Sequence, residues 1–201
     1  LDNLKALEAV RLPSGQPLEY ILAVPGSRYG DFEPVIRPLA AANEATGQNP
    51  AGDWVGETRW QGRRLVVDHR EAMAVHQRQQ RQQQIDELQA LARSLNDKLN
   101  RQEQGRASRG RTVSESGATA RWYQAVKEAR LGHLIQVDLE TGDFGYLLKV
   151  PRQKTLELLD GKLMLVTNVP NLSAETIVER YRALADIERG FRVLKSELEI
   201  G

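Results

Sequence analysis

Two long stretches of the sequence carry apolar residues at the three- to four-residue spacing of an amphipathic helix. Residues 70–103 contain no Gly or Pro and are rich in good helix formers, so they are predicted to form one long helix. Its first half is almost wholly polar, whereas its second half has an apolar stripe that must pack on something. The last stretch follows Ser173, a favoured N-cap residue, and is predicted to be a second long helix.

Shorter apolar runs separated by turn residues predict strands and hairpins. Residues 26–53 are rich in Gly, Pro and Asn and are predicted to be a loop with one helical turn near 39–45. The predicted strands are 18–25, which should be buried, two hairpins at 54–69 and 134–150, and 162–169; short helices are predicted at 2–11, 119–130 and 152–159. A strand, a turn and a helix close the chain, which is an α/β pattern.

Composition narrows the class of protein without indicating a partner. The 201 residues are 40% hydrophobic and 27% charged, and the formal net charge of +1 leaves only local clusters to argue for a polyanionic ligand. The absence of cysteine excludes disulfides and thiolate metal sites. No apolar run reaches the roughly 18 residues of a membrane helix and no signal peptide opens the chain, so the expected compartment is the cytoplasm. The chain begins at Leu1 without a Met and is expected to be an excised piece.

One segment is locally basic. Residues 101–117 contain Gly, Ser and four arginines, Arg101, Arg106, Arg109 and Arg111, with only one Glu before Thr112. The segment is predicted to be a flexible loop. Its arginines either contact nucleic-acid phosphates or are simply solvated, and the sequence favours neither.

The final helix places four polar residues on one narrow face. At about 100° per residue, Tyr181, Arg192 and Lys195 fall within roughly 40° of Glu188. The adjacent stripe is apolar and is expected to be buried; it consists of Leu184, Ile187, Phe191, Leu194 and Leu198. The face is either a solvated edge with an ordinary Glu188–Arg192 ion pair, worth about 0.3–0.5 kcal/mol, or a site where the stripe meets solvent.

This segment resembles the signature of bacterial insertion-sequence DDE transposases, in which Tyr, Arg, Glu and Lys stand at fixed spacings. Tyr181, Glu188 and Lys195 occupy three of those places, and Leu184 occupies the place of the Arg. We hypothesise that Arg192 replaces the missing arginine. Further matches to one branch of the family are Ile187-Glu188-Arg189, Phe191-Arg192 and Leu194-Lys195-Ser196. Residues 160–168 resemble the strand before the catalytic helix in that branch, residues 18–22 the strand after the second catalytic Asp, and residues 1–4 the start of the helix that follows this Asp.

The resemblance implies a ribonuclease-H-like α/β core interrupted by a mainly helical insertion with β-hairpins. The core would comprise residues 1–37 and 151–201, and the insertion residues 38–150. The insertion is expected to contact transposon-end DNA or a second protomer, and its long helix is the expected site of a homodimer contact.

The resemblance also implies Mg²⁺- or Mn²⁺-dependent cleavage and transfer of DNA strands at insertion-sequence ends. Glu188 would be the third catalytic acid and a metal ligand, because Mg²⁺ prefers a few carboxylate oxygens. The expected contacts to terminal-repeat and target DNA are Tyr181, Arg192, Lys195, Arg106, Arg109 and Arg111.

The sequence contains no pair of Asp residues that could serve as the first two catalytic acids. Asp160 precedes Gly161 in a predicted turn, and Asp2 is interpreted as an N-cap. Asp68, His69 and His76 lack a recognised metal-ligand spacing. As given, the chain is therefore expected to lack two of three catalytic acids and to be inactive alone. The alternative is a non-catalytic helical DNA-binding or regulatory module derived from a transposase.

Overall fold

A computed structural model describes residues 4–46, 51–105, 114–138 and 145–197. The chain divides into two compact units: the sheet unit, Leu1–Ala74 with Gly161–Gly201, and the helical unit, Val75–Asp160. Both units contain helices and strands, so the predicted mixed α/β class is confirmed. None of the helices in the described ranges is long and apolar enough to cross a membrane.

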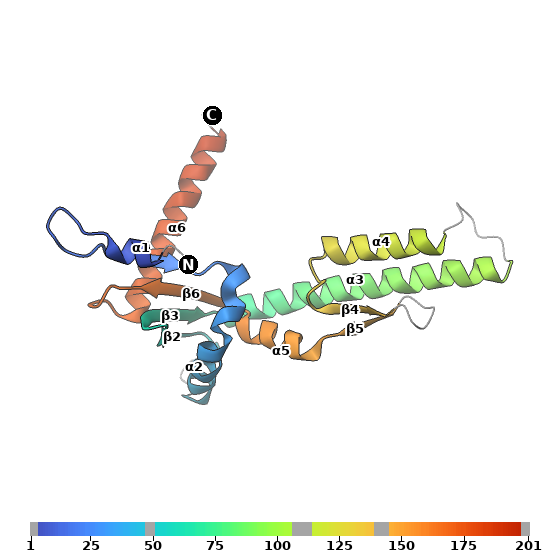
Figure 1. Cartoon of the computed structure of the whole chain (residues 1–201), viewed down its shortest axis with the longest axis horizontal. Coiled ribbons are helices and arrows are strands. Elements are labelled where there is room, and N and C mark those ends of the chain that lie inside the picture. Colours follow the sequence, from blue (N-terminus) through green and yellow to red (C-terminus); the bar gives the residue numbers. More distant parts are fainter. Residues whose placement is uncertain (1–3, 47–50, 106–113, 139–144, 198–201) are drawn as a thin grey trace. The chain divides into compact units, whose positions relative to one another are not determined.

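The sheet unit is built on an open, fully antiparallel four-stranded sheet. Its strands are β1 (Ile21–Ala23), β2 (Trp54–Trp60), β3 (Arg63–His69) and β6 (Lys162–Thr167), in the order β1-β6-β3-β2 (Figure 1). The β2–β3 hairpin turns at Gln61 and Gly62, both with positive φ, as a two-residue hairpin loop requires. This hairpin, which was predicted to lie inside the insertion, is part of the same sheet as β6.

The two faces of this sheet are covered by different helices. Val66 and Leu165 face α6 (Ala174–Glu197), where Ile177 and Val178 are buried against them. On the other face, Trp60 stacks on Phe32 with ring centroids 4.4 Å apart. The core of the unit is therefore formed on both sides of β3 and β6, the two central strands.

The prediction of a loop was wrong for residues 26–46, although the helical turn predicted near 39–45 does lie within a helix. This stretch forms the 3₁₀ helix η1 (Gly26–Phe32) and the α-helix α2 (Glu33–Thr46), before β2 begins at Trp54. Phe32, Ile36 and Ala40 are fully or almost fully buried at helical spacing, and this burial outweighs the helix-breaking effect of Pro38 inside α2.

The strand predicted at residues 18–25 is shorter and less buried than expected. Only Ile21–Ala23 pair with β6, and their side chains are half-buried or exposed because β1 is the edge strand of the sheet. The short helix α1 (Leu4–Ala9) precedes it.

A glycine fixes the turn that leads into β6. Gly161 has a φ of +69°, and a Cβ at this position would lie 2.5 Å from the Arg70 carbonyl oxygen. The Arg70 N–H in turn donates to the Gly161 carbonyl over 2.9 Å. The predicted tight turn at Asp160-Gly161 is thus confirmed, and the site has no room for a side chain.

Gly161→Ala is therefore expected to lower the free energy of unfolding by about 2–3 kcal/mol, because a steric clash adds to the left-handed backbone conformation. The matched control is Gly62→Ala, where φ is +79° but no atom lies within 4 Å of the added Cβ. It should cost only about 1 kcal/mol. Urea unfolding measures both changes, and equal losses would show that the Arg70 contact has no effect.

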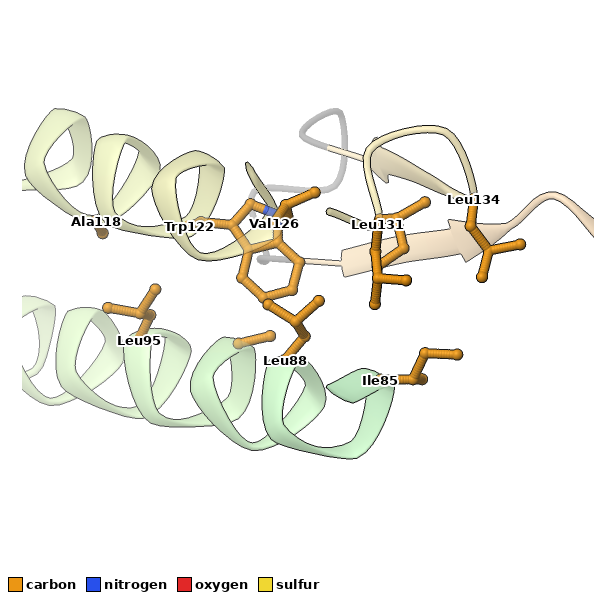
Figure 2. Close-up of a cluster of buried hydrophobic side chains, with 10 residues drawn as sticks. Ile85, Leu88, Leu95, Ala118, Trp122, Val126, Leu131 and Leu134 are labelled. Carbon is orange, nitrogen blue, oxygen red and sulfur yellow. The ribbon is translucent and has the colours of Figure 1, made fainter. Parts of the chain in front are cut away.

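The helical unit has its own core. It contains most of α3 (Glu71–Glu103), with α4 (Glu115–Glu128), the hairpin β4 (Ile135–Asp138) and β5 (Gly145–Leu148), and α5 (Val150–Leu159). In Figure 2 the Trp122 ring projects from α4 toward Leu88 on α3. Leu88 and Leu95 are almost fully buried, so the predicted apolar stripe of the long helix packs as expected.

Candidate active-site helix

The start of α6 is fixed by a side-chain cap. The Thr176 N–H donates to Ser173 Oγ over 3.2 Å, and the Ile177 N–H donates to the Ser173 carbonyl over 3.1 Å. The pKa of Glu175, in the first turn, is lowered by hydrogen bonds from its own backbone N–H and from Ser173. The strand β6, a short turn and α6 therefore follow one another as the sequence predicts, with Ser173 as the N-cap.

The first two turns of α6 dock on the sheet. Ile177 is fully buried and Val178 is 3% exposed, and both pack against Val66 and Leu165. Tyr181 is half-buried beside the same apolar cluster. Its phenol also lies near Tyr29, whose pKa is raised by burial and further by Tyr181.

The buried side of α6 differs from the predicted one. Leu184 and Ile187, which were expected to belong to a buried stripe, are each 55% exposed. The residues of α6 that contact the sheet are Ile177, Val178 and Tyr181. Leu184 lies on the same side of the helix as Ile177 but is exposed, so α6 leaves the sheet after its first two turns. The apolar stripe was read from spacing alone, and spacing does not say where along the helix the sheet ends.

Glu188 occupies a position on the sheet-facing side of the helix. At 100° per residue, positions 177, 181 and 188 fall within about 40° of one another, and position 188 lies roughly 16 Å beyond position 177 along the axis. The backbone is helical through Arg192 and Lys195, so the predicted spacing of the four polar residues is retained. The side chains of Glu188, Arg192 and Lys195 lie outside the part of the structure that is described.

An ion pair between a buried carboxylate and a partly exposed arginine joins α6 to the sheet. Asp68, on β3, is 1% exposed, and its Oδ2 accepts a hydrogen bond from Arg182 on α6. Arg70 Nε lies 3.1 Å from the other carboxylate oxygen of Asp68, and Arg70 also pairs with Asp53 over 3.0 Å. A buried carboxylate is stable only when paired, so this contact determines where α6 can sit.

Sequence reasoning missed this pair. Asp68 was considered only as a metal ligand beside His69, and Arg182 was not considered at all. The available signal was an Asp at the end of the apolar run Leu65-Val66-Val67, because an acid in a buried strand requires a cationic partner.

His69 lies on the opposite face of β3 in a second polar cluster. Its Nε2 is 3.1 Å from Glu71 Oε2 and its Nδ1 is 3.3 Å from Lys162 Nζ, while the Trp54 ring packs 5.4 Å away. Burial lowers the pKa of His69, the Lys162 charge lowers it further, and Glu71 opposes the shift.

This lowered pKa makes stability depend on pH. The unfolded chain binds a proton near pH 6.5, whereas the folded chain binds it only at lower pH. The contribution of His69 is therefore fully present above about pH 6.5 and is lost as the pH falls through the folded-state pKa. Urea unfolding at pH 7.5 and 5.5 should show a smaller loss in His69→Gln than in the wild type. His76→Gln, an exposed histidine on α3, is the control and should leave the loss unchanged.

A cavity of about 860 Å³ lies at the other end of the hairpin. Its walls include Arg59, Arg63, Arg64, Glu8 and Glu57. Arg63 donates two hydrogen bonds to the Glu8 carboxylate, at 2.7 and 2.9 Å, and lowers the pKa of Glu8, as Tyr20 also does. Arg64 pairs with Glu57. Two of the three arginines are thus neutralised by carboxylates, and the cavity is not a strongly basic one.

The described residues do not form a divalent-metal site. Among the side chains that the structure describes, no three His, Asp or Glu residues come close enough to hold an ion. Asp160 is 6% exposed and its Oδ1 accepts a hydrogen bond from Arg81 over 3.1 Å, so it anchors α3 to the end of α5. Glu188 alone would supply too few oxygen ligands for Mg²⁺ or Mn²⁺.

The prediction of a flexible loop over residues 101–117 was wrong at both ends, because α3 continues through Arg101 to Glu103 and α4 begins at Glu115. Arg106, Arg109 and Arg111, which were predicted to contact DNA, fall in the segment 106–113 outside the described residues, as does Asp2. Comparison with protein-family models, curated proteins and solved structures found no match to the chain.

Proposed function

We propose that this chain carries the third catalytic acid, Glu188, of a DDE transposase with a ribonuclease-H-like core. The observation that supports the proposal is the attachment of α6 to the sheet. A central strand, β6, leads through a short capped turn into a helix whose first two turns are anchored on the sheet. Position 188 continues the side of that helix that docks on the sheet, but beyond the described strands, so the other acids would have to come from residues that the structure does not describe.

Tyr181, Glu188, Arg192 and Lys195 each have a distinct role in this proposal. Glu188 contributes one carboxylate to a Mg²⁺ or Mn²⁺ site whose remaining ligands are not among the described residues. Lys195 contacts a DNA phosphate as a point charge, and Arg192 does so through its planar guanidinium. Tyr181, half-buried next to the sheet, hydrogen-bonds or stacks on the strand that is transferred.

The proposed partners are transposon-end and target DNA, with a second copy of the chain in a paired-end complex. The polar and largely exposed first half of α3 remains our candidate for the contact between protomers. The proposed location is the bacterial cytoplasm, at the nucleoid.

Incubation of the full-length protein with a labelled insertion-sequence end tests the proposal. We expect strand cleavage and joined products in Mg²⁺ or Mn²⁺, and none in EDTA. Sequence-specific binding without cleavage in either metal would contradict the proposal and would support the non-catalytic DNA-binding module instead.

A further inference from the structure

Backbone hydrogen bonds bring four basic residues together in the helical unit. The Lys149 N–H donates to the Leu134 carbonyl over 2.9 Å, which places Lys149 beside the turn that contains His133. The Arg152 N–H donates to the Lys149 carbonyl over 2.9 Å, so Arg152 lies one turn further on. Arg130 lies in the turn at the end of α4, and the His133 ring hydrogen-bonds to its backbone.

These side chains are exposed and their charges are not neutralised by described acids. Arg130, His133, Lys149 and Arg152 are all exposed. Within the described ranges, no carboxylate forms an ion pair with Arg130, Lys149 or Arg152. The nearby Arg81 differs, because it is largely buried and paired with Asp160.

The electrostatics of His133 agree with this geometry. Its pKa is lowered first by partial desolvation of the ring, then by the charge of Arg152, and also by Arg81 and Lys149. The largest charge effects on the ring therefore come from cations, as expected at a locus of positive potential.

We infer that Arg130, His133, Lys149 and Arg152 form a binding site for nucleic-acid phosphates, here called the basic patch. The inference rests on the proposed function for the identity of the nucleic acid as DNA. The patch contains only hydrogen-bond donors and a histidine, and the two guanidinium groups match the paired oxygens of a phosphate. It differs from the cavity near Arg63, where Glu8 and Glu57 already pair with two of the three arginines.

An acidic protein surface is the competing partner. The composition of the patch favours DNA, because protein interfaces place aromatic and apolar anchors at their centre, and Val150 is the single large exposed apolar residue recorded on α5. A phosphate backbone requires no such anchor, and its affinity comes from cations and the release of counterions.

The experiment compares the salt dependence of DNA binding by two triple variants of the full-length protein. Fluorescence anisotropy with a labelled duplex would be recorded between 50 and 200 mM salt. Removing three phosphate contacts in Arg130→Gln/Lys149→Gln/Arg152→Gln should reduce the slope of log affinity against log salt by roughly 2–3, at about 0.9 per contact. The matched control is Arg93→Gln/Lys98→Gln/Arg121→Gln, which removes the same charge from exposed positions on α3 and α4.

The outcomes separate the patch from the proposed catalytic function. An unchanged slope in the patch variant, or an equal fall in the control, would overturn the inference even if the protein cuts DNA. A reduced slope specific to the patch variant would support it even if no cleavage occurs, and only the proposed function would then fail. Loss of binding to poly-glutamate with DNA binding intact would show that the patch recognises acidic protein instead. Circular dichroism would confirm that both variants remain folded.

Discussion

Replacing Arg182 with methionine is expected to lower the free energy of unfolding by about 3 kcal/mol at neutral pH. The substitution keeps an aliphatic side chain of similar length on α6 but removes the cation that pairs with Asp68. Asp68 is 1% exposed, so its carboxylate has little access to water that could replace the lost partner. Arg70, 3.1 Å from the other carboxylate oxygen, limits the loss but also has to satisfy Asp53.

The double variant Asp68→Val/Arg182→Met tests whether the unpaired charge of Asp68, rather than a disturbance of the fold, causes this loss of stability. Valine fits a strand whose neighbouring inward residue is Val66, and an apolar pair of similar volume usually costs little or even stabilises. Most of the lost stability should therefore return. Arg180→Met, an exposed position on the same helix, is the control and should change stability by less than about 0.5 kcal/mol. If the double variant were as unstable as Arg182→Met, the buried charge would not explain the effect.

The regular elements of the fold could be predicted from the sequence because their local signals agree with their packing. The long helix α3 has no Gly or Pro and a clear apolar stripe, and the strands β2 and β3 flank a two-residue turn. The α2 helix could not be predicted in this way. Its prolines favour a loop, and only tertiary burial of Phe32, Ile36 and Ala40 reverses that preference.

The candidate site could be predicted only as a spacing along one helix. The sequence places Tyr181 and Glu188 on a common face, but it does not show which side of α6 meets the sheet or how far the sheet extends. For that reason Leu184 and Ile187 were expected to be buried and are exposed. The Asp68–Arg182 pair joins residues 114 positions apart, a relation that periodicity within one element cannot detect.

Glu188→Gln is expected to abolish nearly all DNA cleavage if α6 presents a metal-binding acid. Glutamine has the same shape as glutamate but no negative charge, and it is a poorer ligand for a divalent ion. The loss of several kcal/mol of transition-state stabilisation corresponds to a rate lower by about 1,000-fold, at 1.36 kcal/mol for each factor of ten. Binding of transposon-end DNA should change little, because it depends on basic side chains and not on the Glu188 carboxylate.

The decisive measurement is the Mg²⁺-dependent cleavage rate of full-length Glu188→Gln beside that of Glu179→Gln. Glu179 lies on the same helix and is exposed, so its variant removes an equal charge from α6 away from the proposed site. The account predicts a rate about 1,000-fold below wild type for Glu188→Gln and a wild-type rate for Glu179→Gln. Equal rates for the two variants and the wild type would contradict it.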